Sequence, residues 1–181
     1  AIDAYERGDI DWLASNIGSA AFEYYTHDRV LLIDRQDGPI MAVRDGGRLP
    51  PETMAGTIAQ LQPLLDQLDG IDARAAASAY NAGVTATPPA VVAFQLFESE
   101  PALVSAMPLL SHSGDNILPI GTEPIYVSVL MLDDALAEYL SDQYLVAHPR
   151  FLREAPQNPT ALPIAGEDGA PIAWLEWDVS Q

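Results

Sequence analysis

DRVLLIDRQDGPIMAVR, residues Asp28–Arg44, is the stretch that decides the fold. Two apolar runs, Arg29–Asp34 and Pro39–Arg44, flank a turn at Gln36-Asp37-Gly38. Asp-Gly between apolar runs is a strong hairpin signal, because glycine adopts a positive φ at little cost. The stretch therefore predicts a β-hairpin. The phrase TALPIAGEDGAPIAWLEWD, Thr160–Asp178, repeats the pattern near the end of the chain and predicts a second hairpin.

Helical patterns precede the first hairpin. Residues Ala1–Gly8 are typical of a helix end, and Asp9 or Asp11 can cap a second helix through Ile17. Gly18 fits the position just after that helix, where a left-handed residue is favoured. Ser19–His27 can add a turn or two. The expected buried face of the second helix carries Trp12, Leu13 and Ile17.

A longer helix is predicted after the hairpin, starting at Arg48-Leu49-Pro50-Pro51. Its apolar residues recur at intervals of four, three, four and three, which is the spacing of one helix face. They are Met54, Ile58, Leu61, Leu65 and Leu68. Pro63 lies inside this pattern, and the helix is expected to kink or restart there.

The second half of the chain alternates strands and helices. Asp72 can cap a short helix over Ala73–Tyr80, and Asp133 another over Asp134–Val146. Between them, three runs rich in valine, isoleucine and aromatic residues predict strands. These runs are Ala90–Glu98, Ala102–Leu110 and Ile125–Leu132, with a turn at Glu100-Pro101 between the first two. The first run is also compatible with a buried helix.

Short turns between strands, rather than regular crossover helices, favour an antiparallel sheet. We therefore expect an α/β protein of the α+β type. Its mostly antiparallel central sheet would be flanked by N-terminal helices and covered by others. At 181 residues the chain suits a single domain over residues 1–181.

Charge and composition narrow the function classes. The chain has 8 Lys+Arg against 26 Asp+Glu, for a net charge of −18. Such a surface repels phosphate backbones, so we expect no nucleic-acid partner. The excess of acid serves solubility or attracts cations and amines. There is no cysteine, which removes disulfides, thiolate metal sites and cysteine nucleophiles. No apolar run reaches the ~18 residues that span a bilayer.

Four phrases together resemble the fourth class of CHASE domains, the extracytoplasmic sensor modules of bacterial signalling proteins. They are DIDWLASNIG, DRVLLIDRQDGPIMAV, YVSVLMLDDALAEYL and the terminal DGAPIAWLEWD. They extend from the N-terminal region to Asp178. The terminal Asp-Gly followed by Trp174 and Trp177 is the most specific of the four.

The resemblance implies a fold related to the PAS-like sheets of Cache sensors. It implies a domain placed between two membrane helices on the periplasmic face of the bacterial inner membrane, with this chain excised from between them. It also implies a homodimeric receptor with a cytoplasmic output. That output would be a diguanylate cyclase, a cyclic-di-GMP phosphodiesterase or a histidine kinase. The membrane would be reached only through the flanking helices.

Motifs for catalysis and metal binding are missing from the sequence. The nucleophile-elbow pattern Gly-x-Ser-x-Gly is absent, and Ser111-His112-Ser113 are sequence neighbours, which seldom form a triad. His27, His112 and His148 are scattered without metal-ligand spacing. The phosphate-loop and dinucleotide glycine patterns are also missing. We therefore expect no catalytic residue, no metal and no cofactor.

A small-molecule pocket between the sheet and its covering helices is the remaining candidate site. Such pockets are mostly apolar with a few placed polar groups. On the strand Ile125–Leu132 the even positions share one face and the odd positions the other. The candidate ligand-binding residues, on or flanking the sheet, are Tyr80, Phe94, Ser111, His112, Tyr126 and Ser128. The ligand itself is unknown. A structural dimerisation module without a ligand is the alternative.

Overall fold

The computed structural model describes residues 1–35, 38–84, 89–110, 118–119, 121–158 and 161–178. These residues form two compact units. Unit 1 contains Ala1–Val92 and Ser105–Val129, and unit 2 contains Ala93–Val104 and the residues from Leu130 onward. One six-stranded antiparallel sheet has the order β3-β2-β1-β6-β5-β4, and a second sheet has three strands. The expected α+β fold is confirmed.

The first hairpin forms as predicted and lies in the middle of the large sheet. Strands β1 (Arg29–Asp34) and β2 (Gly38–Arg44) pair antiparallel. Gln36 and Asp37 of the predicted turn lie outside the described residues, and Gly38 has a φ of +87°. The other edge of β1 pairs with β6 (Ile125–Met131). The pairing of β1 with β6 therefore joins the two halves of the sheet.

A further short strand follows where a helix was predicted to start. Asp45 and Gly46 have φ values of +50° and +77° and turn the chain into β3 (Gly47–Leu49). The helix begins later, as the 3₁₀ turn η2 (Pro51–Met54) leading into α4 (Ala55–Asp69). It does not restart at Pro63, which lies inside α4. The predicted apolar face is buried at Met54, Leu61, Leu65 and Leu68, joined by Leu64, whereas Ile58 is half-buried.

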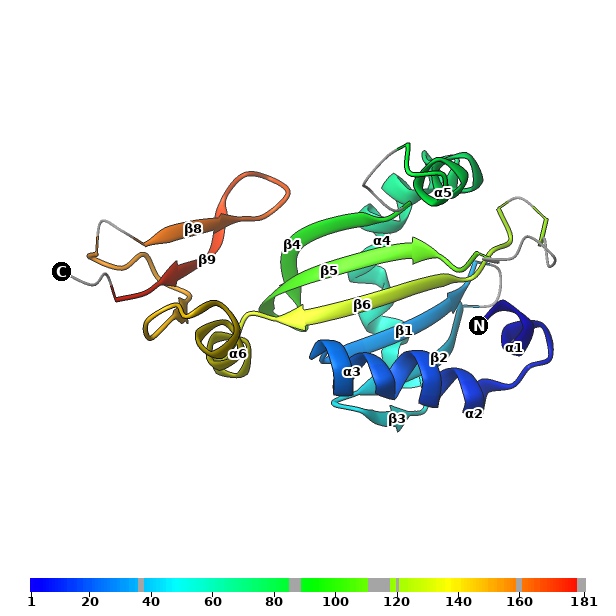
Figure 1. The fold of residues 1–181 in the computed structure, drawn as a ribbon, viewed down its shortest axis with the longest axis horizontal. Helices are drawn as coiled ribbons and strands as arrows, with labels where there is room; N and C mark the ends of the chain where they lie inside the picture. Colours follow the sequence, from blue (N-terminus) through cyan, green and yellow to red (C-terminus); the bar gives the residue numbers. More distant parts are fainter. Residues whose placement is uncertain (36–37, 85–88, 111–117, 120, 159–160, 179–181) are drawn as a thin grey trace. The chain divides into compact units, whose positions relative to one another are not determined.

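Three consecutive N-terminal segments form one continuous helical rod. They are α2 (Ile10–Leu13), the π-helix η1 (Ala14–Ser19) and α3 (Ala20–Tyr25). The short helix α1 (Ile2–Glu6) precedes the rod and is separated from it by a turn in which Gly8 has a φ of +66° (Figure 1). Asp9 caps α2 by accepting a 3.1 Å hydrogen bond from the Trp12 backbone nitrogen. Leu13 is fully buried as expected, but Trp12 is 40% exposed.

Gly18 does not end a helix, as was predicted, but lies inside η1. A Cβ atom at this position would lie 2.5 Å from Cγ2 of Val43 on β2. The glycine therefore permits a close approach of helix to sheet. Figure 1 shows these helices against one face of the sheet. Their shared core consists of Ala4, Leu13, Ala14, Ala21, Val30, Leu32, Met41 and Val43.

The remaining strands of the sheet are β4 (Val91–Phe97) and β5 (Glu100–Pro108), with α5 (Ala73–Asn81) preceding them. The run that was compatible with a helix is thus a strand. The turn between β4 and β5 is at Glu98 and Ser99, with φ values of +51° and +69°, not at the predicted Glu100-Pro101. Both central residues are left-handed, as a two-residue hairpin turn requires.

Unit 2 contains α6 (Asp134–Tyr144) and the small sheet. Asp133 caps α6 by accepting a 3.0 Å hydrogen bond from the Leu136 backbone nitrogen. The small sheet has the order β7-β9-β8, with bounds Arg150–Leu152, Pro171–Glu176 and Leu162–Ala165. The predicted terminal hairpin is present as β8 and β9. None of the described helices is both long and apolar enough to cross a membrane.

Candidate functional site

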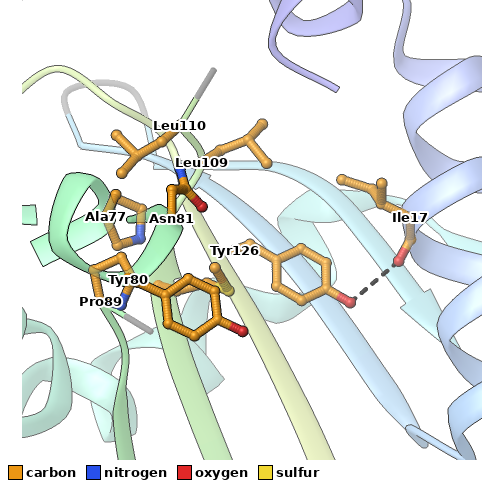
Figure 2. A pocket seen from close by; sticks show the side chains of 10 residues that line it. Ile17, Ala77, Tyr80, Asn81, Pro89, Leu109, Leu110 and Tyr126 are labelled. Atoms are coloured by element: carbon orange, nitrogen blue, oxygen red, sulfur yellow. Dashed lines mark hydrogen bonds between the residues drawn. The ribbon is translucent and has the colours of Figure 1, made fainter. Parts of the chain in front are cut away.

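A cavity of about 390 Å³ in unit 1 is the candidate site. Its walls come from η1, α5, the segment before β4, the end of β5 and the start of β6 (Figure 2). The described lining residues are Ile17, Ala77, Tyr80, Asn81, Pro89, Met107, Pro108, Leu109, Leu110 and Tyr126. The volume lies in the range of small-molecule sites, which are mostly apolar with a few polar groups.

Tyr126 joins the sheet side of the cavity to the N-terminal rod. It lies on β6 opposite Leu32 of β1, on the sheet face that carries the N-terminal helices. Its hydroxyl donates a 3.2 Å hydrogen bond to the backbone oxygen of Ile17, drawn as the dashed line in Figure 2. Burial raises the pKa of Tyr126 to about 12. The hydroxyl therefore remains a proton donor throughout the physiological pH range.

Helix α5 supplies the opposite wall. Ala77, Tyr80 and Asn81 are three and four residues apart, so they share one helical face. The Asp72 carboxylate caps the helix by accepting a 3.0 Å hydrogen bond from the Ala75 backbone nitrogen. Figure 2 shows the Tyr80 ring beside that of Tyr126. The cavity as a whole therefore offers two phenol groups, from Tyr80 and Tyr126, and the carboxamide of Asn81 among apolar neighbours.

A partly buried ion pair holds α5 in place. The guanidinium of Arg74 donates to Oε1 of Glu123 through Nε at 3.0 Å and Nη2 at 2.8 Å. Oε2 of Glu123 accepts a 2.8 Å hydrogen bond from the Gly121 backbone nitrogen. The Glu123 residue is only 6% exposed, and Arg74 also donates to the Leu118 carbonyl. The pair fixes the start of α5 to the segment that leads into β6.

Comparison with known protein families identifies the chain. The family model described as the CHASE4 domain matches residues 1–149. This chain belongs to the CHASE4 domain family. The family consists of extracellular sensor domains of signalling proteins, which are not catalytic. No curated protein matches the sequence.

The match covers unit 1 but not all of the resemblance seen in the sequence. It ends at residue 149, so the terminal phrase with Trp174 and Trp177 lies outside it. The CHASE4 match therefore rests on the N-terminal helices, the first hairpin and the strands up to α6. It includes every described residue that lines the cavity.

Two of the six candidate residues of this CHASE4 domain line the cavity. They are Tyr80 and Tyr126, and their binding role stays a prediction. Phe94 is 37% exposed on β4, and Ser128 is buried on β6; neither is among the described residues that line the cavity. Ser111 and His112 lie outside the described residues.

The sequence reasoning missed most of the lining. Ala77 and Asn81 could have been found, because they lie one turn from Tyr80 in a helix that was predicted. Ile17 could not, because its place depends on the π-helical turn and on the close contact of Gly18 with β2. Met107 lies near the end of β5. Because the predicted β4–β5 turn is misplaced, the sequence did not indicate which residues lie next to Met107.

The site offers hydrogen bonding and apolar contact. No group of three or more metal-ligating side chains that could hold an ion occurs within the described ranges. A smaller cavity of about 210 Å³ in unit 2 is more polar and is lined by residues such as Asp133, Asp134 and Arg153. There the Arg153 guanidinium is already paired with the carboxylate of Glu100. The cavity of unit 1 is therefore the better site for a small molecule.

Proposed function

We propose that this CHASE4 domain senses a small molecule bound in the cavity of unit 1. The observation that carries the proposal is a cavity of ligand size whose walls come from the sheet, α5 and the N-terminal rod. A ligand there contacts elements that are distant in sequence, so it can bias how they pack. The antiparallel sheet with helices over the cavity also supports a PAS- or Cache-like architecture.

The proposed receptor places residues 1–181 as one domain on the periplasmic face of a bacterial inner membrane, between two membrane helices. The ligand shifts the population of two arrangements of a homodimer, provided that it binds one of them more tightly. The flanking helices pass this shift to the cytoplasm. The output there is a diguanylate cyclase, a cyclic-di-GMP phosphodiesterase or a histidine kinase.

The test is a thermal-shift screen of amines, amino acids, organic acids, neutral organic compounds and divalent cations. A ligand that binds only the folded protein raises its melting temperature. A blocking variant, Ala77→Trp, fills the cavity and should abolish the shift. Ala75→Trp places the same side chain on an exposed position of α5 and is the matched control. If no compound raises the melting temperature, the sensing proposal fails.

A structural dimerisation module without a ligand is the second candidate. The observation in its favour is the exposed aromatic surface of α3, where Tyr24 is 74% and Tyr25 70% exposed. This function predicts a dimer in sedimentation equilibrium that Tyr24→Ser together with Tyr25→Ser converts to a monomer. A monomer at all protein concentrations would contradict it.

A further inference from the structure

The hydrogen bond from Tyr126 to Ile17 connects the cavity wall to the N-terminal helices. The acceptor is the backbone oxygen of a residue that also lines the cavity. At 3.2 Å the bond is longer than the ~2.7–2.8 Å of a typical hydroxyl–carbonyl hydrogen bond. Another acceptor inside the cavity can therefore compete for the same hydroxyl. Because the pKa of Tyr126 is raised to about 12, this hydroxyl offers its proton rather than a negative charge.

The acceptor belongs to a turn of unusual geometry. Ile17 lies in η1, where the Ala20 backbone nitrogen donates to the Ser15 carbonyl, five residues back. Such π-turns are rare in proteins and are frequent at functional sites. The residues directly after Ile17 are fixed, because Gly18 contacts Val43 and the Ser19 hydroxyl donates a 2.7 Å hydrogen bond to the Gly46 carbonyl. The hydrogen bond from Tyr126 to Ile17 therefore adds a further contact to those that hold this turn.

The lining also restricts the ligand. All ten described lining residues are uncharged, and their polar side chains are the hydroxyls of Tyr80 and Tyr126 and the carboxamide of Asn81. An ion that left water for these walls would lose its hydration without a described counter-ion. The net charge of −18 attracts cations to the surface but does not place a described carboxylate in this wall.

We propose that the ligand of this cavity is an uncharged molecule with an apolar body and a carbonyl-type acceptor, which takes the Tyr126 hydroxyl from Ile17 and loosens the π-turn Ala14–Ser19. The inference rests on the proposed sensing function and specifies its ligand class and its first conformational step. Binding is thereby coupled to the N-terminal rod through one displaced hydrogen bond.

Four compounds with a similar aromatic body test the ligand class. Acetophenone has a neutral acceptor, benzoate is an anion, benzylamine is a cation, and ethylbenzene has no acceptor. We expect acetophenone to bind about tenfold more tightly than each of the other three, as measured by ligand-observed NMR titration. In Tyr126→Phe its affinity should fall to that of ethylbenzene. Equal or tighter binding of the ions overturns the ligand class, as does the absence of acetophenone binding.

Hydrogen exchange tests the conformational step. Bound acetophenone should speed exchange of the amides in Ala14–Tyr25 several-fold, whereas ethylbenzene should not. Tyr126→Phe should speed the same amides without ligand, and acetophenone should then add nothing. Tyr80→Phe also removes a hydroxyl from the cavity wall but should leave these amides unchanged. Unchanged or slower exchange in Ala14–Tyr25 with acetophenone bound overturns the coupling.

The two proposals fail in different ways. If the broad screen finds only charged ligands, and Ala77→Trp abolishes their binding, the sensing function stands and the neutral-acceptor inference falls. If no compound of the screen or of the aromatic set stabilises the protein, the sensing function itself falls.

Discussion

Gly18 shows how a single missing methyl group can set the position of a helix. It lies inside η1, and a Cβ atom there would overlap Cγ2 of Val43 at 2.5 Å. The closeness of the rod to β2 therefore depends on this one residue. This close packing explains why Gly18 lies inside a helix, although the sequence pattern places it after one.

Gly18→Ala should lower the free energy of unfolding by about 1–3 kcal/mol, the usual cost of overpacking a close contact. The Val43→Ala background should restore part of this loss, because it removes the overlapping methyl group. Gly56→Ala is the matched control: it lies in α4 with open space around it and should gain about 0.5–1 kcal/mol. Urea denaturation measures all three, and a neutral Gly18→Ala would contradict the packing argument.

His27 should make the stability of the protein depend on pH. It is half-buried after α3, its Nδ1 has no hydrogen-bond partner in the described structure, and burial lowers its pKa from 6.5. The unfolded chain then takes up the proton more readily than the folded one. The contribution is complete above about pH 6.5 and is lost as the pH falls from there to the folded pKa.

His27→Gln should therefore flatten the fall of the urea midpoint between about pH 7 and pH 5. The exposed His148, which is paired with Asp178, provides the control. His148→Gln should leave the fall of the urea midpoint between about pH 7 and pH 5 as steep as in the unaltered protein. An unchanged slope in His27→Gln would show that burial of this imidazole has no part in the pH dependence.

At the scale of elements, α5 is held by its ion pair as well as by packing. Arg74→Met would leave the carboxylate of Glu123 buried without its cation, and we expect a loss of about 2 kcal/mol. Arg48→Met breaks the exposed pair with Asp11 and should change stability by less than about 0.5 kcal/mol. Thermal melts of both variants measure the difference. Equal effects would argue that burial of Glu123 is unimportant.

The β4–β5 turn contains residues poorly suited to its geometry. Ser99 has a φ of +69°, a conformation that costs a residue with a side chain more than it costs glycine. Ser99→Gly should therefore stabilise the protein by about 0.5–1 kcal/mol in urea denaturation. Ser105→Gly, inside β5, should lower the free energy of unfolding by a similar amount, because a strand position does not require a positive φ. Destabilisation by Ser99→Gly would contradict the turn assignment.

Local signals explain which elements could be predicted. Each of these signals lies within a few residues of the element that it predicts. They are the helix caps Asp9, Asp72 and Asp133, the apolar spacing of α4 and the first Asp-Gly. Asp45-Gly46 carries the same turn signal, but the prolines that follow it predict a helix start at Arg48 and not the short strand β3. The β4–β5 turn could not be placed, because Glu98 and Ser99 are not typical of a left-handed turn.

The candidate site was less predictable than the fold. Tyr80 could be named from its residue type and its place beside the sheet, and Tyr126 from its residue type and strand face. The other walls depend on contacts between distant segments, such as Ile17 with Tyr126, and no periodicity encodes these. Family membership supplied the class of function, whereas the position of the cavity came from the packing of unit 1.

For the whole molecule, the charge of −18 should oppose folding through self-repulsion. Sodium chloride screens this repulsion, so the urea midpoint should rise as salt increases from near zero to about 0.15 M, where the Debye length is about 8 Å. Potassium chloride at equal ionic strength should act alike. A midpoint that falls with salt would mean that the described ion pairs outweigh the net repulsion.

The pairing of β1 with β6 has a consequence for how the chain is made. The sequence RVLLID is synthesised well before β6 and can close its hairpin with β2 within microseconds. Its other edge, however, is completed only by residues such as Val127 and Val129, which are synthesised much later. An apolar strand edge is thus open until β6 has been synthesised, and open edges of this kind invite pairing with other chains. The nascent chain, rather than the finished protein, is where a chaperone would be needed most.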